Sequence, residues 1–393
     1  MMKGFTRPKF EMADVFGKYG AAYKQSQKLP LNALKTISAI ENCRTAVLGG
    51  HIDQCNECGH ERNAYNSCRN RHCPKCQGLA QLKWLEKRKQ ELLPIRYFHL
   101  VFTIPSELNH LVLINQKVLY TMLFKAASQT VCMLAQQDKH LGAKPGCIAV
   151  LHTWGQNLMD HPHIHMIVTG GGLSADGMKW ISSKKKFFIP VRIMSRVFRG
   201  KYLAFFKKAY HNNDLLFEGK SKQLKEIKQF KQILNALYKK EWIVYAKKTF
   251  GNPEKVLNYL GKYTHRIAIS NHRILGMDNN RICFNWKDYA DKDKQKVMSL
   301  TANEFIRRFL LHVLPSGFFK IRYYGLLSSR NKKENLILCS RLLKVICKLN
   351  NLSGETWQKL LLKITGFDVN KCPCCKKGQM KMIRLIVARG HPF

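Results

Sequence analysis

The sequence predicts an α+β protein in which an antiparallel sheet with packed helices follows a small cysteine-rich N-terminal unit. Segments rich in β-branched and aromatic residues alternate with stretches of helical periodicity. Two strand segments are separated by one short polar turn, as in neighbouring antiparallel strands. Six of the 14 cysteines fall within residues 43–76. With 393 residues and 45% hydrophobic content, the chain is long enough for two or three domains with buried cores.

Proline, glycine and capping residues set the boundaries of the expected elements. Pro105 ends the first strand, and the glycine run that starts at Gly170 closes the third. Asn252 and Pro253 supply an N-cap and a first helical residue, so a helix is expected to about residue 263. Thr301 begins a capping-box pattern, Thr-Ala-Asn-Glu.

These signals order the elements along the chain. Helices are expected at residues 31–40, 81–88, 108–137, within 199–240 with an interruption at Gly219, at 253–263 and at 301–314. Strands are expected at residues 97–105, 147–154, 163–169, 242–245, 266–270, 281–286 and 319–324. We expect four parts: a cysteine-rich unit at 1–92, a central region at 93–280, an extension at 281–366 and a basic tail at 367–393.

The charge balance points to a polyanionic partner. Lys and Arg number 67 against 25 Asp and Glu, which gives a formal net charge of +42. A folded polycation of this kind is typical of proteins that bind phosphate backbones or an anionic membrane surface. No apolar run approaches the roughly 18 residues of a spanning helix, and the first ten residues lack the apolar core of a signal peptide. We therefore expect nucleic acid in the cytoplasm as the partner, and no membrane.

Two C-x2-C pairs in the N-terminal unit predict zinc. They are Cys55 with Cys58 and Cys73 with Cys76. Each such turn directs two sulfurs to one point, so the two pairs together predict a tetrahedral four-cysteine site. Four protein ligands leave no open position, which favours a structural ion.

Further candidate ligands lie between these pairs and in the tail. Four residues alternate with the two pairs and would suit a second, interleaved zinc: Cys43, His51, Cys68 and His72. Packing cysteines and solvated histidines are the alternative interpretation. Cys372 and Cys375 repeat the spacing and define a possible metal site in the tail.

A His-Ile-His strand predicts a second kind of metal site. His163 and His165 are two residues apart on an expected strand, so both imidazoles project from one face. The third ligand should come from the neighbouring strand; Gln156 is the preferred candidate, with His152 and His161 as alternatives. Such a site leaves positions open for phosphate oxygens, which suits Mg²⁺ or Mn²⁺. An incidental histidine pair is the alternative.

Two tyrosines one helical turn apart are candidate nucleophiles. Tyr259 and Tyr263 share one face of the expected helix. A phenol has a pKa of about 10 and needs help to attack. A metal ion that polarises a scissile phosphate would supply that help, and Lys262 or Arg266 could stabilise the developing charge. Attack would give a 5′-phosphotyrosine and a free 3′-OH. Two core tyrosines on an amphipathic helix are the alternative.

Several of these stretches together resemble a known family. They are Cys43–His51, Ser67–Gln77, His152–His165 and Tyr259–Arg266, with further likeness in 305–327. Their order is similar to that of the two-tyrosine HUH rolling-circle transposases of bacterial insertion sequences, in the insertion-sequence family numbered ninety-one. The resemblance covers about residues 30–330.

The resemblance implies an antiparallel HUH nuclease-like core that moves an insertion sequence through single-stranded DNA. It implies that His163 and His165 bind the divalent metal, and that Tyr259 and Tyr263 cleave the end of the element and then the target. The zinc region would help to bind DNA. No Walker A pattern is present, so no ATP is expected and unwinding would fall to host helicase or replication proteins.

Two alternatives differ from this reading. A replication initiator or conjugative relaxase would use the same chemistry, but such proteins usually lack this zinc module. A non-catalytic zinc-dependent DNA-binding protein would use the histidines and tyrosines only structurally. The cysteine cluster argues against a polycation of the membrane surface.

Overall fold

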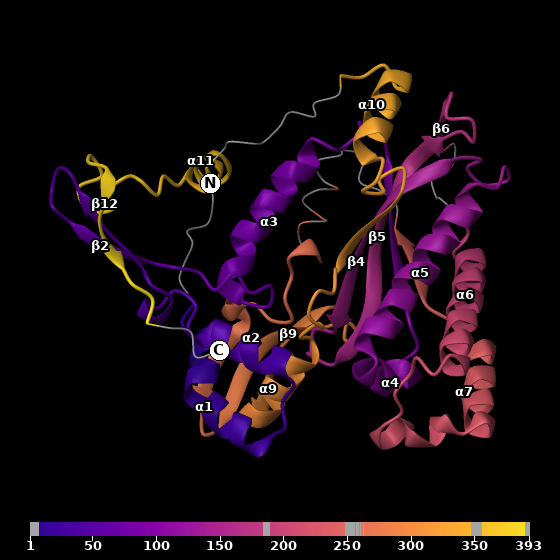
Figure 1. The fold of residues 1–393 in the computed structure, drawn as a ribbon, viewed down its shortest axis with the longest axis horizontal. Coiled ribbons are helices and arrows are strands. Elements are labelled where there is room, and N and C mark those ends of the chain that lie inside the picture. Colours follow the sequence, from indigo (N-terminus) through magenta and orange to yellow (C-terminus); the bar gives the residue numbers. More distant parts are fainter. Residues whose placement is uncertain are drawn as a thin grey trace.

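The computed structural model describes residues 8–183, 189–247, 256, 259, 261, 263–346 and 356–389. These residues form three antiparallel sheets with helices packed around them, which confirms the predicted α+β class (Figure 1). The largest sheet and the sheet that joins the two ends of the chain lie at opposite sides of the molecule (Figure 1).

The largest sheet has the strand order β11-β4-β5-β3-β7, and a short strand, β6, pairs with β5. Its strands are β3 (Tyr97–Thr103), β4 (Lys144–Trp154), β5 (Asp160–Leu173), β6 (Trp180–Ser182), β7 (Val244–Lys247) and β11 (Ile321–Gly325). All of its strand pairs are antiparallel. The strands expected at 97–105, 147–154 and 163–169 are thus confirmed as the three neighbours at its centre.

One face of this sheet carries the main hydrophobic core. Helices α5 (Gln116–Ala135) and α6 (Val191–His211) cover that face, with α4 (Asn109–Ile114) and α7 (Ile227–Lys239) beside them (Figure 1). Ile164, Met166 and Val168 of β5 point into this core. The residues between them therefore point to the opposite face.

The opposite face packs against helices α3 (Pro74–Lys89) and α10 (Lys332–Leu342). Ile148 of β4 and Ile167 of β5 belong to this second cluster, together with Leu336 of α10 and, at its edge, Trp84 of α3. Tyr259 joins the same cluster, so this face also carries the candidate site, whereas the face toward α5 carries the main hydrophobic core.

Helix α5 is long and apolar enough to cross a membrane, the one such helix within the described ranges. Of its apolar window, 67% is buried inside the protein. It packs against β4, β5 and α6, so its composition is that of a core helix.

The second sheet has the order β10-β9-β8 and shares a core with the N-terminal helices. Its elements are β8 (Ile274–Asp278), β9 (Arg281–Asp288), β10 (Lys294–Thr301), α9 (Ala302–Leu311), α1 (Met12–Ser26) and α2 (Leu31–Glu41). Phe16 of α1 packs edge-on against Phe309 of α9, with ring centroids 5.7 Å apart. The Thr301 hydroxyl accepts a hydrogen bond from the Glu304 backbone N–H at 3.3 Å, so the predicted N-cap is confirmed.

The third sheet, β12-β1-β2, brings the two ends of the sequence together. It consists of β1 (Gly50–Cys55), β2 (Glu61–Tyr65) and β12 (Met380–Ile386). Helix α11 (Trp357–Thr365) contacts α3, where Lys363 Nζ lies 3.2 Å from Glu86 Oε1. Short 3-10 helices complete the described chain at Ala46–Leu48, Ser106–Leu108, Gly219–Lys225 and Asn271–Arg273.

Two sequence-based expectations were wrong in detail. Residues 266–270 form no strand; Ile267, Ala268 and Ile269 are buried in side-chain packing without ladder partners, and β8 begins only at Ile274. The helix expected at 108–137 is divided at Asn115, whose side-chain amide donates to the carbonyl oxygens of Leu111 and Leu216. Burial and local hydrogen bonding thus override the local pattern.

Packing crosses all three of the expected domain boundaries. Helices α1 and α2, expected in the unit at 1–92, share a core with strands on both sides of residue 280. Strand β12, expected in the tail at 367–393, pairs with β1. The four-part division stays a prediction, but its first and last parts are joined through one sheet.

Gly325 is a position where we expect any side chain to lower stability. Its φ is +63°, and a Cβ there would overlap the carbonyl oxygen of Pro145. Gly317 is a matched control, because its φ is +70° but nothing lies within 4 Å of a Cβ. We expect Gly317→Ala to lower the free energy of unfolding by about 1 kcal/mol and Gly325→Ala by about 3 kcal/mol. Urea denaturation measures both; equal losses would contradict the close backbone approach.

Candidate active site and metal centres

Strand alternation places four histidines on the face of the large sheet that is turned away from α5. His99 lies on β3 between the core residues Phe98 and Leu100, and His152 lies on β4 next to the core residue Leu151. His163 and His165 lie on β5 and alternate with core residues in the same way. In the ladder, His152 pairs with His163. Three adjacent strands therefore supply imidazoles to one place.

Three of these histidines form a group that could hold a metal ion. One ring nitrogen each of His152, His163 and His165 lies within 4.8 Å of the others. His163 Nε2 is 3.1 Å from His165 Nε2. The predicted pair His163 and His165 thus lies beside His152 rather than beside Gln156.

Backbone carbonyls determine which nitrogens carry protons. His163 Nδ1 lies 2.6 Å from the carbonyl oxygen of His161, and His152 Nε2 lies 2.7 Å from that of Tyr263. A carbonyl oxygen only accepts, so both nitrogens must be protonated donors. The lone pairs of the neutral rings are then left on His163 Nε2 and His152 Nδ1, which is the donor set a cation needs.

Burial keeps these imidazoles neutral. It is the main cause that lowers the pKa of His163 to about 4, and it places the pKa values of His152 and His165 well below the usual range. The positive charge of Arg266 lowers all three pKa values further. Neutral rings are the form in which histidine binds metal.

Both candidate nucleophiles meet this histidine group. Tyr259 and Tyr263 are both helical, and their hydroxyl oxygens lie 3.1 Å apart. The Tyr259 hydroxyl lies 3.1 Å from His99 Nδ1, and the ring centroid of Tyr263 lies 4.0 Å from that of His165. Burial raises the pKa of the Tyr259 hydroxyl, and the hydroxyl of Tyr263 adds to the shift. The structure thus brings the separate sequence motifs together.

His99 links Tyr259 to the group of His152, His163 and His165. Its Nε2 lies 3.0 Å from His165 Nδ1, and its Nδ1 faces Tyr259. If His165 Nε2 is directed to a cation, Nδ1 must carry the proton and donate to His99 Nε2. His99 then carries its own proton on Nδ1 and donates to the Tyr259 oxygen. Sequence reasoning missed this residue, because its place beside β5 depends on a strand order that spacing does not reveal.

Three cations lie near the histidine group. Arg71, Arg266 and Lys320 line a small pocket together with His312, and the charges of Lys320 and Arg266 lower the pKa of His152. Burial, with the charge of Arg71, lowers the pKa of Lys320 to about 8. Concentrated positive charge of this kind attracts an anion such as a phosphate group. The predicted cation Arg266 is therefore beside the site, Lys320 was missed, and Lys262 lies outside the described residues.

Gln156 does not lie in the histidine group, so the preferred third ligand is corrected. Its side-chain amide donates to the hydroxyl of Tyr289 at 3.1 Å. It lies beyond the end of β4 at Trp154, where the polar turn directs it away from the sheet face. His161 contributes its backbone carbonyl to His163. Of the three candidates, His152 is the one with a ring nitrogen in the group.

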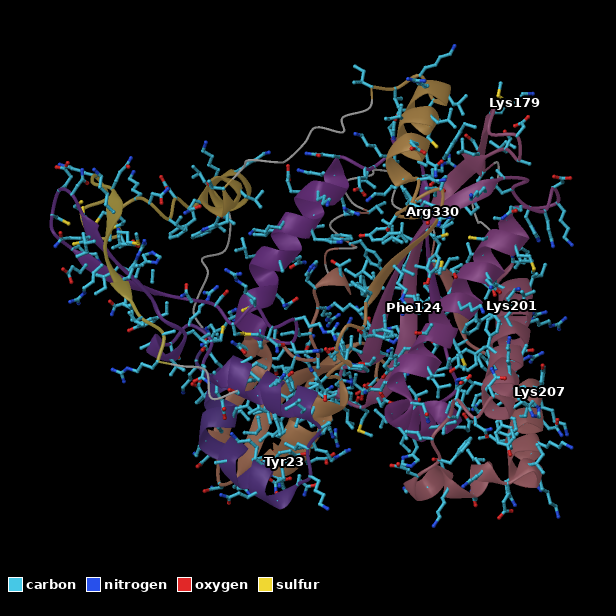
Figure 2. The ribbon with its side chains drawn as sticks, in the orientation of Figure 1. Tyr23, Phe124, Lys179, Lys201, Lys207 and Arg330 are labelled. Atoms are coloured by element: carbon cyan, nitrogen blue, oxygen red, sulfur yellow. The ribbon has the colours of Figure 1, made fainter. Side chains whose placement is uncertain are left out.

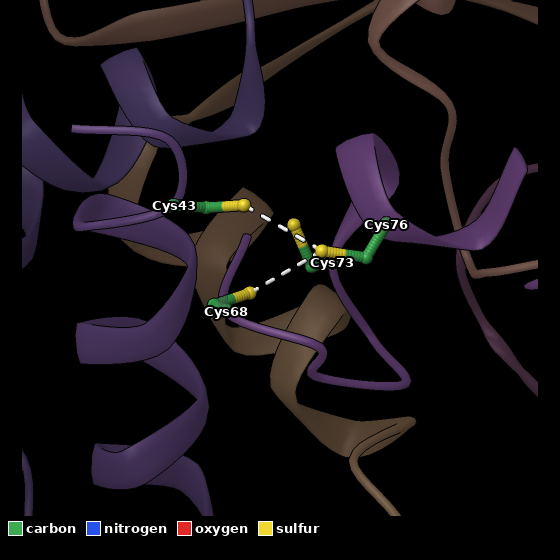
Figure 3. A group of neighbouring side chains, drawn as sticks. All are labelled: Cys43, Cys68, Cys73 and Cys76. Atoms are coloured by element: carbon green, nitrogen blue, oxygen red, sulfur yellow. Dashed lines mark hydrogen bonds between the residues drawn. The ribbon is translucent and has the colours of Figure 1, made fainter. Parts of the chain in front are cut away.

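The cysteines form two groups of four within the described chain. One group consists of Cys43, Cys68, Cys73 and Cys76. Figure 3 shows these side chains pointing toward one another, with Cys76 Sγ 3.6 Å from the sulfurs of both Cys43 and Cys68. The second group consists of Cys55, Cys58, Cys372 and Cys375.

This grouping corrects the prediction that the two C-x2-C pairs share one ion. Cys55 and Cys58 lie at the tip of the β1–β2 hairpin, whereas Cys43 and Cys68 lie at its base. The hairpin contains the five residue pairs from Gly50–Tyr65 to Gln54–Glu61. At about 3.4 Å per residue, tip and base are about 17 Å apart. One ion cannot bind sulfurs that far apart. Cys73 and Cys76 therefore group with cysteines at the base of the hairpin, and Cys55 and Cys58 group with cysteines at its tip.

The two histidines of the expected interleaved site belong to neither group. His51 Nε2 lies 3.2 Å from Asp53 Oδ1 on the same strand. His72 is partly buried, and its Nε2 accepts a hydrogen bond from the backbone N–H of Leu314 at 3.3 Å. Burial lowers the pKa of His72 to about 3. These contacts assign both side chains to local packing, so a Cys43–His51–Cys68–His72 site was wrong.

Positive charge also extends over the outer surface. Lys179 near β6, Lys207 on α6 and Arg330 before α10 are exposed, and Lys201 on α6 is partly exposed (Figure 2). The charge available to a polyanion is therefore not confined to the pocket.

Comparison with known proteins defines the class. Residues 146–335 match a family model described as "Putative transposase", and residues 15–104 match a "Transposase zinc-binding domain". The chain is therefore a transposase, a class that acts on DNA.

The relatives identify the family. A "Putative transposase y4qJ" of Sinorhizobium fredii is 46% identical over 95% of each chain. The "Transposase for insertion sequence element IS801" of Pseudomonas savastanoi pv. phaseolicola is 28% identical over 76% of this chain and 70% of its own. The chain belongs to the transposases of the IS91 type, which carry this zinc-binding domain. No solved structure is significantly similar to it.

The depressed histidine pKa values predict an acid-resistant metal site. Since the folded-state pKa of His163 is about 4 rather than 6.5, its ring stays neutral as pH falls through 6.5. We expect Mn²⁺ binding, measured by electron paramagnetic resonance, to persist to about pH 5 and to be lost as protons compete below that. Half-loss near the ordinary histidine pKa, about 6.5, would contradict the buried neutral arrangement.

Proposed function

We propose that this transposase cleaves and rejoins single-stranded DNA through 5′-phosphotyrosine intermediates on Tyr259 and Tyr263, and moves an insertion sequence by a rolling-circle route. The observation that carries the proposal is the convergence of two phenol hydroxyls and three neutral imidazoles on one sheet face. The family supports DNA as the substrate.

The histidine group fits a divalent cation. The lone pairs of His163 Nε2 and His152 Nδ1 are fixed by their carbonyl partners, and His165 Nε2 faces His163. Facing lone pairs repel one another unless a cation lies between them. Mg²⁺ or Mn²⁺ held by these three residues would polarise the scissile phosphate and offset its charge.

The tyrosines carry the covalent step. The attacking phenol oxygen forms a bond to phosphorus, and the bond from phosphorus to the 3′ oxygen breaks. The phenol proton is released and the leaving oxygen gains one, so the products are a 5′-phosphotyrosine and a free 3′-OH. A later 3′-OH would reverse this exchange on the same ester, so the exchange itself would need no ATP.

His99 orients the attacking group. Its Nδ1–H is directed to the oxygen of Tyr259, and this contact fixes the phenol next to the histidine group. A donor at that oxygen also stabilises negative charge as the O–H bond weakens. The 3.1 Å distance between the two hydroxyls allows either tyrosine to take its turn at one phosphate.

Cations of the chain complete the site. Arg266, and Lys320 beside it, offer charge for the phosphate at the moment when its negative charge grows. We propose that Cys43, Cys68, Cys73 and Cys76 bind a structural Zn²⁺ that holds the start of α3 to the N-terminal helices. The basic surface would bind DNA in the cytoplasm, and host helicase would supply unwinding.

Two other functions are less well supported. A replication initiator or relaxase would share the tyrosine chemistry, but the zinc-binding domain and the transposase relatives favour transposition. A non-catalytic DNA-binding protein has no need of tyrosine hydroxyls held beside a group of neutral histidines.

Replacing both tyrosines is expected to abolish covalent capture of DNA. Purified protein with Mn²⁺ and single-stranded DNA from the element end should give an adduct that resists denaturing electrophoresis. Tyr259→Phe with Tyr263→Phe should reduce it by at least about a thousandfold, because no nucleophile remains. Tyr238→Phe, at an exposed position on α7, is the control and should be unchanged. An adduct that survives the double substitution would place the nucleophile elsewhere.

Replacing His99 tests the orientation of ligand and nucleophile together. His99→Gln should weaken Mn²⁺ binding by about 10- to 100-fold, because His165 loses its supporting partner. Saturating Mn²⁺ should restore binding, but the rate of adduct formation should stay low since Tyr259 has lost its donor. His110→Gln on α4 is the control. Wild-type affinity together with a wild-type rate would show that His99 has only a packing role.

A further inference from the structure

Four cysteines from opposite ends of the sequence meet at the tip of the β1–β2 hairpin. Cys58 Sγ is 3.7 Å from Cys372 Sγ, and Cys55 Sγ is 3.7 Å from Cys375 Sγ. All four sulfurs lie within 4.8 Å of one another. Four sulfurs at about 2.3 Å from a tetrahedral Zn²⁺ are about 3.8 Å apart, whereas a disulfide requires about 2.0 Å. The spacing fits a metal tetrahedron.

The surrounding backbone is arranged for thiolates. The N–H of Glu57 donates to Cys55 Sγ at 3.4 Å, and the N–H of Gly378 donates to Cys375 Sγ at 3.3 Å. Each C-x2-C pair thus has one of its sulfurs hydrogen-bonded by its own turn. Such donors stabilise the charged sulfur that binds a metal.

Gly378 leaves the space that the group needs. A Cβ at this position would lie 2.5 Å from Cys55 Sγ and 2.7 Å from Glu57 Cγ. Any side chain would therefore push the tail away from the hairpin. The tail follows the hairpin closely, since the N–H of Asn56 donates to the Gln379 carbonyl at 3.1 Å.

Hydrophobic burial does not explain how the tail is held. The cluster at this place contains Met380 as its only described residue other than the cysteines. Along β12, Met382 and Leu385 are 60% and 69% exposed. A strand with so little buried surface needs another source of stability, and in small loop-rich units that source is commonly a metal ion.

We propose that Cys55, Cys58, Cys372 and Cys375 bind a second structural Zn²⁺, which fastens the C-terminal strand to the N-terminal hairpin. Half of its ligands lie far beyond residues 15–104, the range that matches the zinc-binding domain, so the site is built by both ends of the chain. Four thiolates leave no coordination position open, so the ion holds structure and takes no part in DNA cleavage.

Zinc content of the purified full chain tests the proposal. Wild-type protein in reducing buffer should contain two zinc ions per chain, and Cys372→Ser with Cys375→Ser should contain one. Cys374→Ser is the matched control, because this exposed cysteine lies in the same turn but outside the group; it should keep two. The decisive result is the difference between the two proteins: a double variant that holds as much zinc as the wild type would overturn the proposal, whereas one zinc in the wild type that the double variant lacks would contradict only the separate site of Cys43, Cys68, Cys73 and Cys76.

A second variant preserves every thiol. Gly378→Val should lose one zinc ion because its side chain meets Cys55 Sγ. Amide hydrogen exchange should then rise in β12 and stay unchanged in β3 and β5. Full zinc content with unchanged exchange in β12 would also contradict the proposed site.

Discussion

The alternation of side chains along three neighbouring antiparallel strands is the constraint on which the rest of this molecule depends. Residues of β3, β4 and β5 that face α5 and α6 form the apolar core, so every second residue is free for chemistry on the other face. His99, His152, His163 and His165 occupy such positions. The same packing that stabilises the sheet therefore fixes the directions of the imidazoles.

Hydrogen bonds to these histidines then determine which of their ring nitrogens keep a free lone pair. The carbonyl of Tyr263 holds His152, so the tyrosine segment and β4 restrain each other directly. His99 continues the chain of contacts from His165 to Tyr259. Movement of Tyr263 would therefore alter the orientation of His152 and the position of the Tyr263 hydroxyl together. We infer that the histidine group and the two tyrosines change position together.

Sequence reasoning found the parts that have local signatures. The strand of His163 and His165, the tyrosine pair and the Thr301 cap could be read from spacing alone. It missed β10, because the inner positions of this strand, Lys296, Met298 and Leu300, are only partly buried and begin with a lysine, which leaves a weak hydrophobic alternation. It also missed His99 and preferred Gln156, since the choice among histidines depends on strand order and on where the turn after Trp154 leads.

The partners of Cys55 and Cys58 could not be predicted from spacing either, because they lie at the other end of the sequence. This separation also affects the order in which the N-terminal unit is completed during synthesis. The hairpin of β1 and β2 pairs with β12, a strand more than 300 residues later in the chain. At about 5–20 residues per second, a ribosome needs roughly 15 to 60 s to make the intervening chain. Throughout that interval the hairpin lacks its third strand, and Cys55 and Cys58 lack their partners Cys372 and Cys375. Chains released early would keep that edge open, so only a polypeptide translated through β12 acquires the finished N-terminal unit.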